Sequence, residues 1–248
     1  EKEEKLEKLQ EEFYDLVRSV PNMPKDDVVV GRDESENKVL KTKGEPTKFN
    51  FEPKDHLALG LGQDLIDVER ATKVSGARFA YLKNEAVFLE FALIRHAFDF
   101  LSKESFIPVI VPTIVNESAI DGLGYGEYKA GEGYKVGNQY LVGTAEHSLV
   151  PMHMDEVLNV KSFPIRYVGF SSAFRKEAGS YGKDTKGIFR LHQFDKVEMV
   201  SFVLPQHDDK EHDYLLSLEE KLFDSLEIPY QVVKMCTGDL GFPVGRKY

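Results

Sequence analysis

Two extended runs joined by a glycine-containing loop constrain the fold of this chain more than any other feature. The runs are PIRYVGFSSAFRKE, residues 164–177, and FRLHQFDKVEMVSFV, residues 189–203, and three glycines lie between them. Aromatic and β-branched residues with a glycine-rich connection are typical of an antiparallel hairpin with a long tip. Together with helical patterns on either side, this hairpin predicts an α+β domain in which helices flank a largely antiparallel sheet.

The flanking segments give further elements. A helix is predicted from Asn84, a plausible N-cap, and its apolar stripe consists of Val87, Phe91, Ile94, Phe98 and Leu101. A second helix is predicted to open with a capping box of Asp208 and Glu211, and PYQVVKM, residues 229–235, reads as a strand. FIPVIVPTIV, residues 106–115, predicts a short buried strand, in which Pro112 favours a sheet edge or a special interface.

The first residues carry a different pattern. Apolar side chains recur at alternating spacings of three and four residues, at Leu6, Leu9, Phe13, Leu16 and Val20. This spacing is that of a coiled-coil seam, and an ordinary amphipathic helix is the alternative. The polar segment that follows predicts a linker with one short strand, so we divide the chain into an arm (1–21), a linker (22–54) and a main domain (55–248).

Composition limits the classes of function. A formal net charge of −10 argues against a protein that coats nucleic acid generally, although a local basic patch can still hold one RNA. The single cysteine excludes an internal disulfide and suits a reducing compartment. Since no signal peptide and no apolar span of membrane length is seen, we expect a cytoplasmic protein without a membrane partner.

The predicted hairpin carries a group of charged and aromatic side chains on one face. Strand periodicity puts Arg175 and Glu177 on one face, and on the returning run it puts together Arg190, His192, Phe194, Lys196 and Glu198. The connecting loop carries a local excess of cations, with five Lys or Arg against two acids. One interpretation is a solvent-exposed face with cross-strand ion pairs. The other is a nucleotide site, because guanidinium groups suit phosphate and Phe194 offers a surface for stacking.

Four stretches in order carry a resemblance. FRKEAG with GIFRLHQFDKVEM is similar to motif 2 of the class II aminoacyl-tRNA synthetases, in the form typical of the serine-specific enzymes. The other three are DHLALGLGQDLIDVERATKVSGARFAYL (55–82), the motif 1 strand ending at Pro112, and GTAEHSLVPMH (143–153). The resemblance covers about residues 50–248 and implies an antiparallel sheet flanked by helices, a homodimer formed around motif 1 at Pro112, and a coiled-coil arm that embraces tRNA, of which residues 1–20 are the end.

The resemblance also implies an ATP site on the hairpin. By position, Arg175 contacts the α-phosphate and is the catalytic residue, and Glu177 contacts the adenine amino group. Phe194 stacks on adenine, Leu191 contacts the nucleotide through its backbone, and Arg190 belongs to the same site.

The remaining site residues follow from the same resemblance. Thr144, Glu146 and Glu198 are expected around the serine substrate. The alternative for Thr144 and Glu146 is a helix N-cap with a first-turn acid, and Glu198 could instead pair with Lys196 or a neighbouring strand. The cationic loop is expected to contact the tRNA through Lys176, Lys183 and Lys186.

The implied activity is a serine–tRNA ligase, which uses ATP and Mg²⁺ to form seryl-adenylate and then transfers serine to the 3′ end of tRNA(Ser). The glycine-rich motif 3, its arginine and the metal-binding acids of the family find no match before residue 248, so the chain is expected to be truncated at both ends and incomplete for catalysis. Two alternatives stay open: a threonyl or prolyl enzyme, and a non-catalytic paralogue that binds ATP or an aminoacyl-adenylate. The run GLGYGEYKAGEG, residues 122–133, is predicted to be a flexible loop rather than a dinucleotide fingerprint.

Overall fold

A mixed three-stranded sheet lies at the centre of the fold in the computed structural model, which describes residues 2–125, 128–177 and 186–248. Its strands are β4 (Ile107–Ile110), β8 (Ile165–Phe174) and β9 (Gln193–Phe202). Strands β8 and β9 are antiparallel along their whole length, with Ile165 opposite Phe202 and Phe174 opposite Gln193, whereas β4 runs parallel to β8. The predicted α+β fold and its long hairpin are confirmed.

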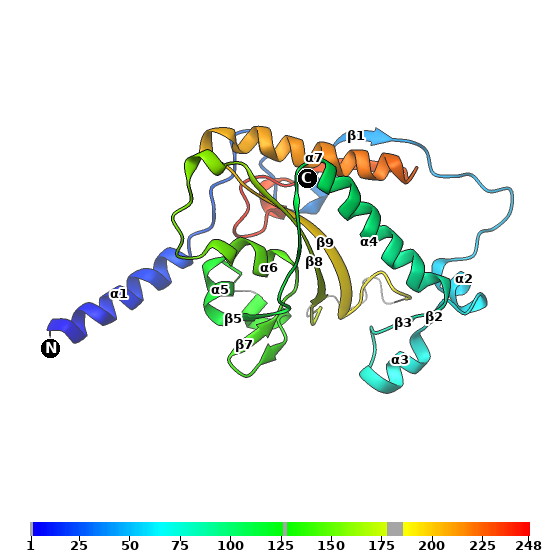
Figure 1. Cartoon of the computed structure of the whole chain (residues 1–248), viewed down its shortest axis with the longest axis horizontal. Coiled ribbons are helices and arrows are strands. Elements are labelled where there is room, and N and C mark those ends of the chain that lie inside the picture. The colour runs from blue at the N-terminus through cyan, green and yellow to red at the C-terminus, as the bar shows by residue number, and fades with distance from the viewer. Residues whose placement is uncertain (1, 126–127, 178–185) are drawn as a thin grey trace.

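Smaller sheets and the helices surround this hairpin (Figure 1). The other strands are β1 (Lys38–Lys43), β2 (Ile66–Asp67), β3 (Tyr81–Leu82), β5 (Ile114–Asn116), β6 (Lys135–Val136), β7 (Gln139–Leu141) and β10 (Tyr230–Lys234). They pair as β1 with β10, β2 with β3, and β5 with β7 and β6. The α-helices of the described residues are α1 (Lys2–Arg18), α2 (His56–Gly62), α3 (Val68–Ser75), α4 (Glu85–Lys103), α5 (Glu117–Gly122), α6 (Glu146–Leu149) and α7 (Asp208–Ser225).

The two faces of the central sheet have different partners, because successive side chains of a strand point to opposite sides. On one face Val168 packs with Leu101 of α4, Phe106 and Leu218 of α7. On the other face Tyr167 packs in a cluster with Val111, Ala145 and Leu149, the last of which belongs to α6. The odd-numbered residues of β8 and the even-numbered residues of β9 therefore share the face that α6 covers at one end.

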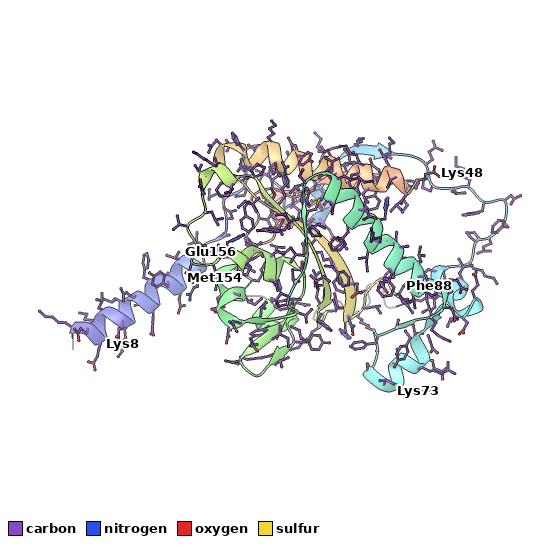
Figure 2. The ribbon with its side chains drawn as sticks, in the orientation of Figure 1. Lys8, Lys48, Lys73, Phe88, Met154 and Glu156 are labelled. Carbon is purple, nitrogen blue, oxygen red and sulfur yellow. The ribbon has the colours of Figure 1, made fainter. Side chains whose placement is uncertain are left out.

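Helix α1 projects from the body of the molecule (Figure 1), and none of its residues is buried. The side chain of Lys8 points from it into solvent (Figure 2). Its apolar seam is open, since Leu6, Leu9, Phe13 and Leu16 are each more than half exposed. An uncovered apolar stripe of this kind is suited to pack on a second helix, so the coiled-coil interpretation stays a prediction.

The segment predicted as a linker contains the expected short strand, and this strand is attached to the far end of the chain. Strand β1 pairs with β10 in antiparallel fashion. Nearby, Val28 is buried, and a Cβ placed on Gly31 would lie 2.7 Å from Sγ of the fully buried Cys236. The division into arm, linker and main domain stays a prediction.

Both predicted helix starts differ from the structure in their capping. Asn84 stands at the N-cap of α4, but its amide donates to the Asp64 carbonyl over 2.9 Å and does not cap the helix. Helix α7 begins at Asp208 after His207, and the capping box is wrong because Glu211 is bound instead by Arg166, at 2.5 and 2.7 Å. A guanidinium provides a charge-assisted partner that a backbone N–H does not match.

The predicted strand over residues 106–115 is divided in two. Strands β4 and β5 belong to different sheets, and Pro112, which has no backbone N–H, lies in the bend between them. Strand β4 lies at the sheet edge as predicted, but it is not buried: Ile110 is 82% exposed. The N-terminal half of α4 is also open, as the outward-pointing Phe88 shows (Figure 2), and of the predicted stripe only Leu101 is buried.

The glycine-rich run at residues 122–133 is more ordered than predicted. A π-helical turn spans Tyr128–Glu132, and the Tyr128 ring is buried with Tyr140 and Val142. The nearby glycines leave room for this ring, since a Cβ on Gly143 would lie 2.6 Å from it. The described part of this run therefore contains a helical turn packed against the core, where a loop was predicted.

Candidate functional site

The candidate site lies on the β8–β9 face beyond the apolar cluster that contains Leu149. Small residues of β8 stand opposite large functional residues of β9, as Gly169 opposite Glu198, Ser171 opposite Lys196 and Ala173 opposite Phe194. A Cβ on Gly169 would lie 2.6 Å from Cδ1 of Leu149, so the glycine allows α6 to approach the sheet closely. The large polar side chains of this face thus come from β9, and the facing residues of β8 are small.

Arg175 and Glu177 lie just beyond the end of β8, and Arg190 and His192 just before β9, so the predicted strands are shorter than expected. The pairing nevertheless continues for one step. The Arg175 N–H donates to the His192 carbonyl over 2.9 Å, and Nδ1 of His192 lies 2.9 Å from the Arg175 carbonyl. Arg175 therefore still projects from the hairpin end nearest Phe194, which lies opposite Ala173.

Arg175 is fixed at one edge of its guanidinium. Its Nε donates to the Gly143 carbonyl over 2.9 Å, and its Cζ lies 5.3 Å from the centroid of the Phe194 ring. In the part of the chain that the structure describes, no further hydrogen bond or ion pair holds this guanidinium. Its terminal nitrogens can therefore donate to an anion beside the aromatic ring, which is the geometry that phosphate recognition needs.

His147 supports Gly143 from behind. Nδ1 of His147 accepts a hydrogen bond from the Gly143 N–H over 3.2 Å, and its ring packs against Tyr125 and Tyr128, with centroids at 4.9 and 4.7 Å. Burial, with a smaller contribution from the charge of Arg175, lowers the pKa of His147 from 6.5 to about 4. The neutral ring keeps Nδ1 available as an acceptor.

A polar cluster of Thr144, Lys196 and Glu198 occupies the centre of the face. The Lys196 ammonium donates to Oγ1 of Thr144 and to Oε1 of Glu198, each over 2.8 Å. The Thr144 hydroxyl donates to Oε2 of Glu198, which also accepts the Glu146 N–H over 3.0 Å. Two of the three predicted serine-binding side chains are therefore in direct contact, and the pairing of Glu198 with Lys196 that we kept as an alternative is present too.

Glu146, the third predicted serine-binding residue, is turned toward Tyr125, whose hydroxyl donates to Oε1 over 2.8 Å. Burial raises the pKa of Glu146, against the opposing effect of the Tyr125 hydrogen bond. The alternative for Thr144 and Glu146 is present as well: α6 is preceded by Ala145 in helical conformation, Oγ1 of Thr144 accepts the Glu146 N–H over 3.4 Å, and Glu146 is the acid in the first turn.

Glu177 and Arg190, both predicted to bind ATP, pair with each other. Nη1 of Arg190 donates to Oε2 of Glu177 over 2.6 Å. Glu177 adopts a positive φ of 52°, in the left-handed region that residues other than glycine rarely occupy. Leu191, partly buried, follows in the turn that leads to β9.

The predicted tRNA-contacting lysines are not equivalent. Lys176 is exposed, with its ammonium 5.7 Å from the centroid of the Tyr134 ring. Lys186 is paired with Asp55, and Lys183 lies outside the described residues. Beside Lys186, Phe189 is 75% exposed and its ring packs on His56 at 4.2 Å.

Pro112, the predicted dimer contact, is exposed and follows strand β4, whose residues line an apolar groove. Its carbonyl accepts the Ser148 hydroxyl over 2.7 Å. The groove, of about 560 Å³, runs between α4 and β4 and is lined by Phe91, Ile94, Arg95, Phe98, Asp99, Ser102, Pro108, Val109, Ile110 and Phe170.

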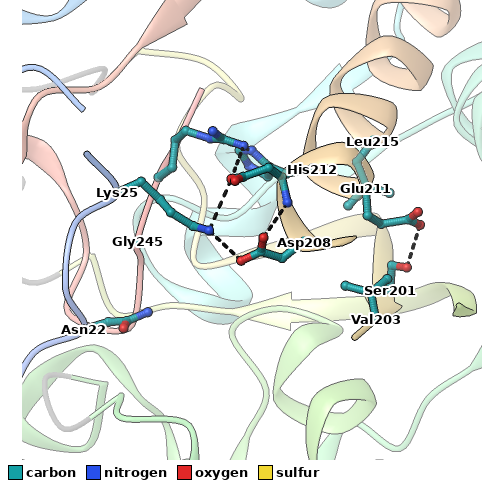
Figure 3. Close-up of a pocket in the computed structure, with 11 residues that line it drawn as sticks. Asn22, Lys25, Ser201, Val203, Asp208, Glu211, His212, Leu215 and Gly245 are labelled. Atoms are coloured by element: carbon teal, nitrogen blue, oxygen red, sulfur yellow. Dashed lines mark hydrogen bonds and ion pairs between the residues drawn. The ribbon is translucent and has the colours of Figure 1, made fainter. Parts of the chain in front are cut away.

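A second cavity, of about 300 Å³, lies at the start of α7 and holds no predicted site residue (Figure 3). Its cations and acids neutralise each other: Lys25 binds Asp208 at 2.6 Å and Asp209 at 3.2 Å, and Arg246 binds Asp209 at 3.1 Å. We therefore assign these charges to stability.

Sequence reasoning missed Tyr125, His147 and the central role of Lys196. Lys196 was detectable, since it shares the strand face of Glu198. Tyr125 and His147 gave no signal, because the contact between their rings joins two separate segments.

Two features are absent from residues 2–125, 128–177 and 186–248. No group of three or more His, Cys, Asp or Glu is placed to hold a metal ion among them. None of the helices in those ranges is long and apolar enough to cross a membrane.

Comparison with known proteins places this geometry in context. Residues 134–248 match the family described as tRNA synthetase class II core domain (G, H, P, S and T). A serine–tRNA ligase of Borrelia recurrentis is 46% identical over 234 residues, which are 93% of this chain and 55% of that protein.

Solved structures agree. The seryl-tRNA synthetase of Pyrococcus horikoshii complexed with ATP superposes with a TM-score of 0.94 at 40% identity, covering 98% of this chain and 60% of that one. The cytoplasmic serine–tRNA ligase of Naegleria fowleri in complex with AMP gives a TM-score of 0.92 at 29% identity, covering 98% and 59%. The chain therefore spans somewhat more than half the length of the relatives it matches.

Proposed function

We propose a serine–tRNA ligase activity for this chain, which belongs to the class II tRNA synthetases and is homologous to serine–tRNA ligases over nearly its whole length. The reaction would activate L-serine with ATP to seryl-adenylate and then transfer the seryl group to the 3′ end of tRNA(Ser). The observation that carries the proposal is one sheet face on which an arginine beside an aromatic ring adjoins the cluster of Thr144, Lys196 and Glu198.

In the first step the serine carboxylate attacks the α-phosphorus of ATP and pyrophosphate leaves. We assign the α-phosphate to Arg175, whose terminal nitrogens project beside Phe194, and the adenine ring to Phe194 itself. Glu177, held by Arg190, would accept the adenine amino group, and the Leu191 backbone would contact the nucleotide. Charge neutralisation and alignment dominate phosphoryl-type transfer, and a positioned guanidinium supplies both.

The serine side of the site would use Thr144, Glu146 and Glu198. A carboxylate and a hydroxyl acceptor suit an ammonium and a small hydroxylated side chain. Such a site rejects alanine, because a buried acceptor would then lose its hydrogen bond. In the second step a terminal ribose hydroxyl attacks the seryl carbonyl and AMP leaves, with Lys176, Lys183 and Lys186 as proposed contacts for the tRNA.

Mg²⁺, which the resemblance implies, has no ligand set among the described residues. The acids nearest the site are engaged: Glu146 by Tyr125, Glu177 by Arg190, and Glu198 by Lys196. Mg²⁺ prefers several oxygen ligands in octahedral geometry, which this arrangement does not offer. We therefore assign no step to the ion.

We further propose that the protein is a homodimer that meets around Pro112. The apolar groove between α4 and β4, with Ile110 and Phe88 widely exposed, offers surface that a second copy would cover. Sedimentation at micromolar concentration tests this, because a pure monomer would contradict it. A cytoplasmic location is also proposed, as the single, unpaired Cys236 suits a reducing compartment.

The decisive experiment is amino-acid-dependent ATP–pyrophosphate exchange with the full-length protein, comparing serine, threonine and proline. We expect exchange with serine alone, followed by charging of tRNA(Ser). Exchange with threonine or proline would replace the proposal by another class II specificity. Nucleotide binding without exchange or charging would favour the non-catalytic paralogue.

A further inference from the structure

Lys196 occupies a position of unusual chemistry within the candidate site. Its ammonium lies between Oγ1 of Thr144 and Oε1 of Glu198, at 2.8 Å from each. A hydroxyl oxygen and a carboxylate oxygen at these distances form a binding place for an ammonium group. The substrate that we propose brings an ammonium group of its own to the same two side chains.

The surroundings favour a mobile Lys196. Its side chain is 33% exposed, whereas that of Glu198 is 16% exposed, so the cation stands at the open side of the pair. A lysine carries its charge on a flexible stem with four methylene groups and does not form the rigid two-point pair of an arginine. The acceptors, by contrast, are anchored, because Oε2 of Glu198 is bound by the Thr144 hydroxyl and by the Glu146 N–H.

Ser171 supplies a second, independent observation. It lies directly opposite Lys196 on β8, is 1% exposed, and its hydroxyl has no hydrogen-bond partner among the described residues. A buried hydroxyl without a partner is costly, so a cation that reached it would gain a hydrogen-bond acceptor. Its neighbours on the same face, Gly169 and Ala173, are small, and Leu149 of α6 packs over Gly169 on one side of Ser171.

We propose that Lys196 is an internal substitute for the α-ammonium of the substrate. It fills the subsite of Thr144 and Glu198 in the absence of substrate, and it is displaced toward Ser171 when an amino acid binds. The inference rests on the proposed function, since it takes serine as the ligand. Lys196 is then a specificity-determining residue, because a ligand that lacks an ammonium cannot replace the charge that Lys196 provides to Glu198.

The arrangement has an energetic consequence. A substrate ammonium must compete with a cation that is already hydrogen-bonded, so part of its interaction with Glu198 is offset by the bond that Lys196 loses. In return, the partly buried carboxylate of Glu198 is never left without a cationic partner. Removal of the competing cation should therefore tighten the binding of ammonium ligands selectively.

The test measures two ligands on the full-length protein by isothermal titration calorimetry at pH 8, with a non-hydrolysable ATP analogue present. L-serine carries both an ammonium and a carboxylate, and 3-hydroxypropionate lacks the ammonium. For Lys196→Met we expect the Kd of serine to fall about tenfold, as for the loss of one competing charge-assisted hydrogen bond, with no gain for 3-hydroxypropionate. Lys196→Arg keeps the cation and should not tighten serine.

Lys41→Met is the matched control, because Lys41 also pairs with a glutamate, at 2.5 Å, but on β1 in a different sheet. It should leave both Kd values unchanged. Thermal melting confirms that each variant is folded, and Lys196→Gln replaces the methionine variant if the latter is not.

The inference would be overturned if Lys196→Met bound both ligands more weakly by the same factor, or if the ratio of the two Kd values did not change. Lys196 would then be a structural partner of Glu198. These outcomes are separable from failure of the proposed function. If the wild-type protein neither binds serine nor shows serine-dependent exchange, the proposed function fails. If the wild-type protein does both, but Lys196→Met has the wild-type ratio of the Kd values for serine and 3-hydroxypropionate, only the displacement of Lys196 by the α-ammonium is rejected.

Discussion

We expect acidification to destabilise the fold through His147, a ring that the protein keeps neutral. The residue is only 2% exposed, and its Nδ1 accepts the Gly143 N–H over 3.2 Å. Burial and the nearby charge of Arg175 lower its pKa from 6.5 to about 4. A proton on Nδ1 would place two donors face to face and bury a charge beside a guanidinium.

The size and sign of the effect follow from proton linkage. Between pH 6.5 and pH 4 the unfolded chain binds a proton at His147 that the folded chain does not, so each step of acidification favours unfolding. The stability is fully present above pH 6.5 and is lost as the pH falls toward 4. At about 1.4 kcal/mol for each pH unit, the loss amounts to about 3 kcal/mol.

Glu146 acts in the opposite direction. Burial raises its pKa in the folded state, so acidification relieves the cost of keeping its carboxylate charged. The pH dependence of the wild-type protein alone therefore mixes contributions of opposite sign, including that of carboxyl groups with a lowered pKa such as Glu211, and a variant is needed to isolate His147.

The assay is urea denaturation of the wild-type protein and of His147→Gln at intervals from pH 7.5 to pH 4. Glutamine can accept the Gly143 N–H through its side-chain oxygen but does not titrate. The difference in the free energy of unfolding between the two proteins should shift by about 3 kcal/mol in favour of the variant across this range. If both proteins lose stability in parallel, His147 is not held neutral and the reasoning is refuted.

Two further predictions concern charged side chains. Arg175→Ala should lower serine-dependent exchange about 10²- to 10³-fold, because an electrostatic partner of the phosphate is lost. Arg175→Lys should recover little activity, since lysine cannot reproduce the guanidinium that is anchored on the Gly143 carbonyl. Exchange by Arg175→Ala within tenfold of the wild-type rate would contradict this role. Glu211→Gln should lower the free energy of unfolding by about 3 kcal/mol in urea denaturation at pH 7, because it leaves the largely buried guanidinium of Arg166 without its carboxylate. Glu69→Gln removes one partner of an exposed pair and should lower it by less than about 0.5 kcal/mol.

The hairpin was predictable because its signal is local. Period-two alternation put Phe194, Lys196 and Glu198 on one face, and the observed pairing with Ala173, Ser171 and Gly169 agrees with that alternation. The strand ends were not predictable to the residue. Arg190 and His192 continue the pattern of the strand but lie before β9, and although the His192 carbonyl still accepts from Arg175, the His192 N–H donates to the Arg78 carbonyl, outside the hairpin.

Predictions of burial and of side-chain partners, which depend on tertiary contacts, were less successful. The stripe of the 84–101 helix implied burial, but Phe91 is 62% exposed, because it lines the open groove between α4 and β4. The capping box failed for a similar reason. A long-range guanidinium from β8 outcompetes the local backbone for Glu211, and no local pattern reveals such a partner.

The sequence by itself determined the α+β class, the hairpin, and the face that carries Arg175, Phe194 and Glu198, because strand periodicity is a property of neighbouring residues. Only the tertiary structure decided that Lys196 stands between Thr144 and Glu198, that Tyr125 binds Glu146, and that His147 supports the loop that holds Arg175. These contacts join residues that are up to 54 positions apart in the chain. Their geometry depends on how α6 packs on the sheet over Gly169, and no local pattern encodes that packing.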